Sequence, residues 1–277
     1  MATRLRRHLA GSVAAEEMTR QAMAPHLEVL LTPADFEKLP ERDLSKTDCV
    51  VFDVLRATSS MMTALANGAA GIFPVREIKE ALELRGRHPG ALLAGERGGL
   101  RIPAALSGGV EFDMGNSPRE FTRERVAGRE IIMTTTNGTR ALQACAGARR
   151  VLPAAFLNLA AVAGELRNEL AECLCIICAG TYEEAAFEDT VAAGALCDLL
   201  WRHFGGGPDG ISDSAQIARQ IYLDAAADVP GAIAGRSRNA RHLLSVAGLR
   251  EDVAFCLRRD ALDVVAEMRQ GAVALIV

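Results

Sequence analysis

The sequence predicts an α/β fold in which helices flank a largely parallel or mixed sheet, followed by a helical C-terminal region. From His26 onward, short apolar runs alternate with amphipathic stretches, which is typical of layered α/β proteins. The glycine-rich segment 205–210 then interrupts the pattern, and the stretches after it are mainly helical. With 277 residues, the chain is near the upper size for one domain, so we expect one large domain or two that share a sheet.

The apolar runs give the expected strands, and the amphipathic stretches give the expected helices. Strands are predicted at 27–31, 49–54, 71–75, 91–94, 130–134, 150–154, 174–178 and 272–277. Helices are predicted at 59–67, 78–87, 118–126, 138–145, 158–170, 188–204, 212–227, 230–246 and 252–256. Residues 1–25 are expected to be a poorly ordered extension, and 26–277 the α/β domain, with a candidate sub-boundary near 205–211. An organelle transit peptide is the alternative for the extension, but Glu16 and Glu17 count against it.

The composition indicates a soluble, cytoplasmic protein with a small-molecule partner. No stretch reaches the roughly 20 apolar residues that span a bilayer, and a net charge of −4 without a basic block excludes a nucleic-acid footprint. The seven cysteines lie mostly in apolar runs, as expected of reduced thiols. Cys175 and Cys178 have the CxxC spacing of a zinc or redox motif, but we favour a packing role for both.

In open α/β sheets, ligands bind beyond the carboxyl ends of the strands, so the polar residues that follow the apolar runs are candidates for the site. Asp53 and Arg56 follow the run 49–52, just before a helix that begins with hydroxyl residues. Asp53 can bind a hard cation, while Arg56, Thr58 and Ser59 can bind an anion at the start of the helix. Alternatively, Asp53 pairs with Arg56 and Thr58 caps the helix.

A second strand end repeats this arrangement of an acid and an arginine. Glu96 and Arg97 follow the apolar run 91–94 and are flanked by glycines that allow a ligand to approach the backbone. A surface ion pair would not require three glycines, so we favour a functional role for both side chains.

Two further segments place uncharged polar groups ahead of helices. Helix caps explain some of these residues, but a cluster of five hydroxyl or amide groups at 134–139, interrupted only by a glycine and followed by an arginine, indicates an anion cradle. Neither a P-loop nor a dinucleotide-binding fingerprint is present, which disfavours nucleotide binding. The candidate anion-binding residues are Asn116, Ser117, Thr134, Thr135, Thr136, Asn137, Gly138, Thr139 and Arg140.

The stretch 180–189 carries acids between a strand and a helix. Glu188 and Asp189 begin the predicted helix, where the helix dipole alone favours them. With Asp53 and Glu96 at neighbouring strand ends, however, they can complete an all-oxygen site for Mg²⁺.

These motifs resemble, in order and spacing, the 2-phosphosulfolactate phosphatase family. The segments that carry the resemblance are FDVLRAT at 52–58, GER at 95–97, GNSP at 115–118, MTTTNGTR at 133–140 and the stretch 180–189. The resemblance implies a distinctive α/β fold and a Mg²⁺-dependent acid phosphatase that converts 2-phosphosulfolactate to sulfolactate and phosphate on the route to coenzyme M. Two departures are the N-terminal extension and a longer link at 103–109.

We therefore predict a phosphatase in which Asp53, Glu96, Arg56 and Arg140 are catalytic. Mg²⁺ would be held by members of the set Asp53, Glu96, Glu188 and Asp189, and Arg97 would join the residues that bind the substrate. A bound water is favoured as nucleophile over the Asp53 carboxylate, because the DxDx[TV] pattern of aspartyl-phosphate enzymes is absent. The alternatives are a non-catalytic anion-binding or regulatory protein, a related phosphatase for another 2-phospho acid, and a phosphotransferase. A homodimer is expected from the prevalence of symmetric oligomers.

Overall fold

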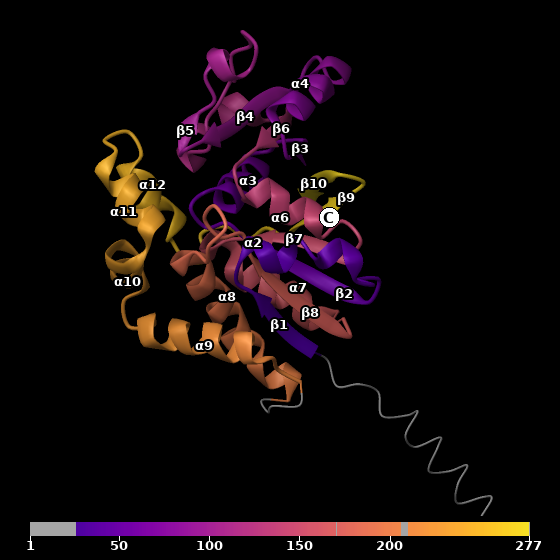
Figure 1. The fold of residues 1–277 in the computed structure, drawn as a ribbon, viewed down its shortest axis with the longest axis vertical. Helices are drawn as coiled ribbons and strands as arrows, with labels where there is room; N and C mark the ends of the chain where they lie inside the picture. Colours follow the sequence, from indigo (N-terminus) through magenta and orange to yellow (C-terminus); the bar gives the residue numbers. More distant parts are fainter. Residues whose placement is uncertain (1–25, 170, 206–209, 277) are drawn as a thin grey trace, which may run out of the picture.

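The computed structural model describes residues 26–169, 171–205 and 210–276. Its strands form two sheets, with helices packed around them (Figure 1). The predicted extension 1–25 lies outside the described residues. The first sheet has the order β1-β8-β2-β7, and all its strand pairs are parallel. Its strands are β1 (His26–Leu30), β8 (Cys173–Cys178), β2 (Thr47–Phe52) and β7 (Arg150–Ala154).

The second sheet is mixed and has the order β5-β4-β6-β3-β10-β9. Strands β4, β6 and β3 are parallel neighbours, whereas β5, β10 and β9 pair antiparallel at the edges. The strands are β3 (Gly71–Pro74), β4 (Leu92–Arg97), β5 (Leu100–Arg101), β6 (Glu130–Thr134), β9 (Ala266–Arg269) and β10 (Ala272–Leu275).

The structure confirms the predicted α/β class with mixed sheets and a helical C-terminal region, but it divides the strands between two sheets. The apolar pattern identifies strands without specifying which of them pair, so this division was not accessible from the sequence. Strands β5 and β9 were not predicted because the first has two residues and the second carries Glu267 and Arg269.

The core lies on both faces of the first sheet. Val50 and Phe52 of β2 pack with the buried faces of α7 (Leu159–Asn168) and α8 (Phe187–Leu200). The alternate residues Cys49 and Val51 pack in a second core that contains residues of both sheets. A strand buried on both faces reads as a continuous apolar run, which is why β2 was recognised in the sequence.

The remaining helices connect the strands or form the C-terminal region. The connecting helices are α2 (Pro33–Phe36), α3 (Ala57–Ala66), α4 (Ile78–Arg87), α5 (Arg123–Val126) and α6 (Gly138–Ala144). The C-terminal ones are α9 (Asp213–Ala225), α10 (Val229–Arg236), α11 (Arg238–Ser245) and α12 (Arg250–Cys256). In Figure 1, α10, α11 and α12 lie together along one side of the molecule. No helix among the described residues is long and apolar enough to cross a membrane.

Two predicted helices are each broken in the structure. The stretch 230–246 forms α10 and α11, which meet at Ser237 in an extended conformation. The Ser237 hydroxyl accepts a hydrogen bond from the amide of Ala240 at 2.9 Å and so caps α11. The stretch 118–126 likewise forms a 3-10 turn (Pro118–Glu120) followed by the short α5.

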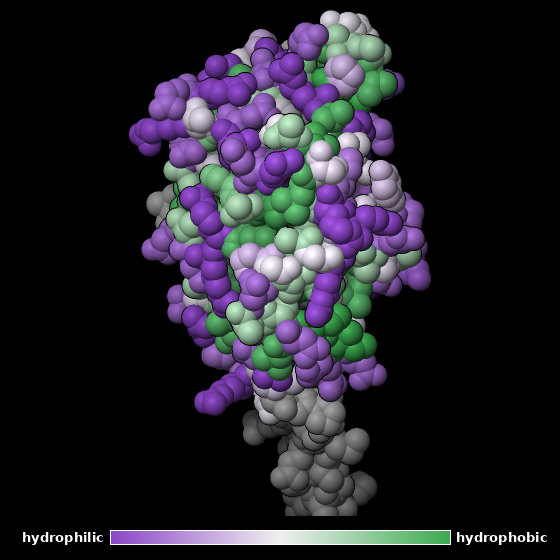
Figure 2. Space-filling model, turned by 90° about the vertical axis from the view of Figure 1, so that its left-hand side faces the viewer, coloured by the Kyte–Doolittle hydropathy of each residue, from purple (hydrophilic) through white to green (hydrophobic). Residues whose placement is uncertain are grey.

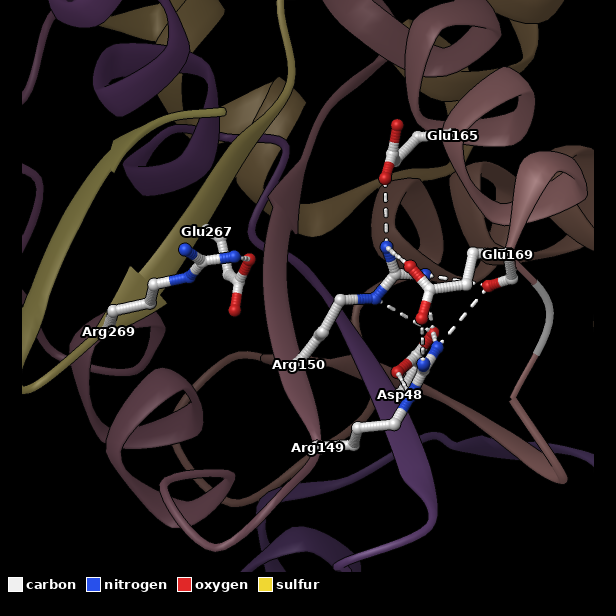
Figure 3. Close-up of polar contacts among 7 residues, drawn as sticks. All are labelled: Asp48, Arg149, Arg150, Glu165, Glu169, Glu267 and Arg269. Atoms are coloured by element: carbon white, nitrogen blue, oxygen red, sulfur yellow. Dashed lines mark hydrogen bonds and ion pairs between the residues drawn. The ribbon is translucent and has the colours of Figure 1, made fainter. Parts of the chain in front are cut away.

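A buried ion cluster joins the amino ends of β2 and β7 to α7 (Figure 3). The side chain of Asp48 is fully buried and accepts hydrogen bonds from Arg149 (Nε 2.8 Å, Nη2 2.7 Å) and Arg150 (Nε 3.2 Å, Nη2 2.7 Å). Arg150 also reaches Glu165 at 2.8 Å and the backbone carbonyl of Glu169, which is the C-cap of α7, at 2.9 Å. The cluster therefore supplies a hydrogen-bond donor to a carbonyl at the carboxyl end of α7 and connects this helix to the sheet.

Candidate active site

A cleft of about 330 Å³ lies where β2, β4, β6 and β8 end. The position agrees with the rule that α/β proteins bind ligands beyond the carboxyl ends of their strands. The cleft is lined by Asp53, Leu55, Arg56, Glu96, Gly98, Gly99, Asn116, Thr136, Asn137, Gly180, Thr181, Tyr182, Arg238, Asn239, His242 and Leu243.

Asp53 directly follows β2 and presents one carboxylate oxygen that no described residue hydrogen-bonds. Its Oδ1 accepts a hydrogen bond from the amide of Ala57, at the start of α3, at 3.1 Å. Burial raises the pKa of the Asp53 carboxyl to about 7, and the nearby negative charges of Glu96 and Glu188 contribute to the increase. Both effects disfavour the ionised carboxylate, so a cation bound beside Asp53 would stabilise it.

Gly138, the first residue of α6, allows that helix to approach Asp53 closely. A Cβ atom at position 138 would lie 2.5 Å from Asp53 Oδ2 and 2.7 Å from the Cβ of Ala57. Only glycine fits between these two groups, which gives the glycine of the TTTNGTR segment a steric explanation.

Asn137 and Asn116 each present a buried amide oxygen without a partner among the described residues. The orientation of the Asn137 amide is well defined, because its Nδ2 donates to the carbonyls of Ala179 and Tyr182, both at 3.0 Å. Its Oδ1 is therefore a buried acceptor on a residue that lines the cleft. Buried acceptors without a donor are unfavourable, so a bound cation, water or hydroxyl group would stabilise both amides.

Glu96 lies at the end of β4 and accepts hydrogen bonds at both of its oxygens. Oε1 accepts from the amide (2.8 Å) and the hydroxyl (2.9 Å) of Thr136, and Oε2 accepts from the amide of Gly99 at 2.8 Å. The carboxylate therefore holds the loop after β6 and the turn after β4 against each other.

Arg56 lines the cleft but is paired with an acid from the C-terminal region. Its Nη1 donates to Asp252 of α12 at 2.7 Å, and its Nη2 donates to the carbonyl of Gly99. The alternative in which Asp53 pairs with Arg56 is therefore wrong, because the acid that pairs with Arg56 is Asp252.

Glu188 and Asp189 are buried beneath the cleft and do not line it. Asp189 accepts from the amides of Val54 at 2.8 Å and Gly180 at 3.1 Å. Glu188 accepts from Ser237 and Asn239, both at 2.6 Å. Burial raises the pKa of Asp189, with further contributions from the charges of Glu188 and Asp53. These two acids join the loops and helices around the cleft.

Arg97 and Arg140 lie in a neighbouring pocket rather than in the main cleft. This pocket of about 430 Å³ shares Thr136 with the cleft and contains Glu37 and Arg76. Arg140 pairs with Glu37 and, at 3.2 Å, with Glu183. The structure thus separates these arginines from Arg56, with which the sequence grouped them.

Most of the predicted anion-cradle hydroxyls bond to the protein itself. The residues in this group are Thr58, Ser59, Ser117, Thr134, Thr135 and Thr139. Thr58 bonds the Asp53 carbonyl at 2.9 Å, for example, and Thr134 bonds the Arg76 carbonyl at 2.9 Å. Of the polar cradle residues, Asn116, Thr136 and Asn137 line the cleft.

Four lining residues on α11 were missed by the sequence analysis, namely Arg238, Asn239, His242 and Leu243. Their segment follows no strand, so the rule of strand ends could not identify it. Arg238 and His242 are four residues apart and share a helix face, a spacing that many surface helices also have. Figure 2 shows the side of the molecule on which α10 to α12 lie, with apolar and weakly polar residues running down a face bordered by hydrophilic ones.

The oxygen atoms at the cleft suit a hard cation. Mg²⁺ is bound by one or two carboxylates together with waters and substrate oxygens, and Asp53 Oδ2 with the Asn137 amide oxygen offers such ligands. Across the described ranges, no group of three or more His, Cys, Asp or Glu side chains is arranged to hold a metal ion. The predicted set of four carboxylates is therefore not assembled as one cage in this part of the chain.

The fold and the cleft define an α/β enzyme with its site at the carboxyl ends of parallel strands. A family model described as 2-phosphosulpholactate phosphatase matches residues 34–271. A protein of Caldicellulosiruptor saccharolyticus named "Probable 2-phosphosulfolactate phosphatase" is 36% identical over 244 residues, which are 87% of this chain and 96% of that protein. One of Symbiobacterium thermophilum with the same name is 37% identical over 249 residues, 86% of this chain and 97% of that one.

The chain therefore belongs to the 2-phosphosulpholactate phosphatase family. It is accordingly a phosphatase, that is, a phosphoric monoester hydrolase. The family assignment confirms the resemblance drawn from the DVLRAT, GER, GNSP and TTTNGTR segments.

Proposed function

We propose that this protein is a Mg²⁺-dependent phosphatase that hydrolyses 2-phosphosulfolactate to sulfolactate and phosphate in the cytoplasm, on the route to coenzyme M. The names of its relatives support the substrate. The observation that supports the metal is the Asp53 carboxylate, which has one oxygen without a hydrogen-bond partner among the described residues and lies at a cleft with unpaired amide oxygens.

In this proposal, Asp53 and the amide oxygen of Asn137 hold Mg²⁺, and Asn116 completes the oxygen-rich side of the cleft. When bound, the metal would offset the charge of the phosphoryl oxygens and lower the pKa of a coordinated water. Glu96 positions Thr136 and the turn at Gly99, and Arg56 lines the cleft while it is paired with Asp252.

Hydrolysis forms a bond from the water oxygen to phosphorus and breaks the bond from phosphorus to the ester oxygen. The leaving oxygen of the 2-hydroxy acid takes up a proton, and the attacking water loses one. Phosphate transfer depends mainly on alignment and charge neutralisation, and the cleft supplies both from groups whose positions are set by hydrogen bonds.

The test is phosphate release from 2-phosphosulfolactate, phospholactate and phosphoglycolate, with Mg²⁺ and with EDTA. We expect Mg²⁺-dependent release that is fastest with 2-phosphosulfolactate. Asp53→Asn should reduce turnover by about 100-fold or more, the scale of losing one electrostatic group of an active site. Asp213→Asn, on the exposed start of α9, is the control and should behave as wild type.

Metal binding has a second readout that does not depend on activity. Mg²⁺ should raise the melting temperature of the wild-type protein and leave that of Asp53→Asn unchanged. Equal turnover in EDTA would overturn the metal proposal, and the absence of phosphate release from all three substrates would favour a non-catalytic anion-binding protein.

A further inference from the structure

The strand ends supply the carboxylates of the cleft, and α11 supplies a further cation and further polar side chains. Asp53 and Glu96 come from the ends of β2 and β4, whereas Arg238, Asn239 and His242 come from α11. A substrate with a phosphate and a second acidic group therefore has two chemically different surfaces to contact. Helix α11 is far from Asp53 in the sequence, and it lies outside the sequence motifs of the family.

Helix α11 is held firmly where it meets the cleft. Asn239 Nδ2 donates to Glu188 and to the hydroxyl of Thr181, both at 2.6 Å, and Ser237 donates to Glu188 at 2.6 Å. Glu188 is buried in α8, so the first turn of α11 is anchored to the core of the enzyme. An anchored helix can present side chains to a substrate without a large loss of conformational entropy.

Arg238 is available to bind an anion. Its side chain is 52% exposed and pairs at 2.7 Å with Glu184, which is 71% exposed. Ion pairs at such exposed positions contribute about 0–1 kcal/mol at most. A substrate acid that enters the cleft can therefore replace Glu184 at small cost and gain a charge-assisted hydrogen bond.

His242 lies one helical turn after Arg238 and points toward Gly99. Its Nε2 is 3.6 Å from the place where a Cβ at position 99 would lie, and Arg56 Nη2 is 3.9 Å from the same place. Because residue 99 is a glycine, no side chain fills the space between His242 and Arg56. In its Nε2–H tautomer, His242 can donate into this space beside the positive charge of Arg56, which suits an oxyanion.

We propose that Arg238 and His242 of α11 bind the second acidic group of the substrate, a carboxylate or a sulfonate, while the phosphate lies at the Asp53 side. These residues would then determine the preference for phosphate esters that carry a second acidic group over those that do not. The inference rests on the proposed phosphatase function and assigns specificity to a region outside the sequence motifs.

The experiment compares four esters: 2-phosphosulfolactate, phospholactate with only the carboxylate, phosphorylated 2-hydroxyethanesulfonate with only the sulfonate, and ethyl phosphate with no second acidic group. Arg238→Gln and His242→Ala should each raise KM for the preferred acidic ester by about 10-fold, the scale of one charge-assisted hydrogen bond, with a smaller change in kcat. Neither variant should change kcat/KM for ethyl phosphate more than about twofold. The ester with the larger loss identifies which acid α11 binds.

Arg241→Gln is the matched control, because Arg241 lies on the same helix and donates to the carbonyls of Gly235 and Arg236 outside the cleft. It should keep the wild-type KM for every ester. If Arg238→Gln and His242→Ala lose as much on ethyl phosphate as on the esters with a second acidic group, or lose nothing on any ester, the proposal is overturned.

Binding of sulfolactate, measured by calorimetry, separates this proposal from the proposed function. If wild type binds sulfolactate and Arg238→Gln binds it about 10-fold more weakly, α11 recognises the acid even if no ester is hydrolysed. If all four esters are hydrolysed but both variants match wild type in KM and sulfolactate affinity, the phosphatase function stands and the α11 proposal fails.

Discussion

Arg56 and Asp252 form a buried ion pair at 2.7 Å, although 196 positions separate them in the chain. Asp252 also accepts hydrogen bonds from Ser117 at 2.7 Å and from Arg119 at 2.9 Å. A single carboxylate on α12 thus organises an arginine of the cleft and the GNSP segment. The C-terminal helical region is therefore a structural part of the site.

Asp252→Asn should destabilise the protein and reduce activity. It leaves the guanidinium of Arg56 buried without its counter-charge, and breaking a buried pair in this way costs about 3–5 kcal/mol. Denaturant unfolding measures the loss. Glu251→Gln is the control, because Glu251 also pairs with Arg119 but is 75% exposed, so its loss should cost less than about 1 kcal/mol. Equal stability of the two variants would contradict the proposed importance of the Arg56 pair.

Gly138→Ala should abolish the close approach of α6 to Asp53. The new Cβ would clash with Asp53 Oδ2 at 2.5 Å and with Ala57 at 2.7 Å, so either helix must move. We expect a loss of about 2 kcal/mol in stability, typical of overpacking, together with a marked fall in kcat. Gly86→Ala, in α4 with open space around it, should be neutral or stabilising by up to about 1 kcal/mol. Wild-type turnover in Gly138→Ala would refute the steric argument.

Asp53→Asn should stabilise the metal-free protein at high pH. The folded pKa of Asp53 is about 7, above the roughly 3.9 of an unfolded aspartate. Its favourable contribution is therefore complete below about pH 4 and is lost as the pH rises through 7. In EDTA at pH 8, the variant should be more stable than wild type by roughly 2 kcal/mol, because the half-buried Asp53 carboxylate is partly screened by solvent. The difference should vanish at pH 4. A pH-independent difference would exclude titration of Asp53 as its cause.

Asp48→Asn should affect stability without affecting the chemistry. Asp48 neutralises Arg149 and Arg150 in the cluster of Figure 3, so its replacement leaves two arginines short of a counter-charge. The expected loss is about 3 kcal/mol or more in denaturant unfolding, because the carboxylate is fully buried. The folded variant should retain the wild-type KM and kcat, and a selective change in KM would show that the cluster communicates with the cleft.

Local patterns in the sequence were sufficient for most of the strands and for six of the sixteen residues that line the cleft. Strands β6 and β7 were predicted with the observed bounds, because buried runs of apolar residues are local signals. Asp53, Glu96 and Asn137 were identified because they directly follow such runs and the carboxyl ends of neighbouring strands converge. The family could also be recognised from the sequence, because its motifs lie at these strand ends.

Only the tertiary structure decided how these groups are used. The sequence contains Arg56, Arg97 and Arg140 as equivalent candidates, but packing places the first in the cleft and the other two in a neighbouring pocket. It also brings α11 to the cleft and gives Arg56 its partner Asp252. The physical reason is that strand and helix signals depend on neighbours in the chain, whereas strand pairing, the partners of charged groups and the lining of a cleft depend on contacts between distant segments.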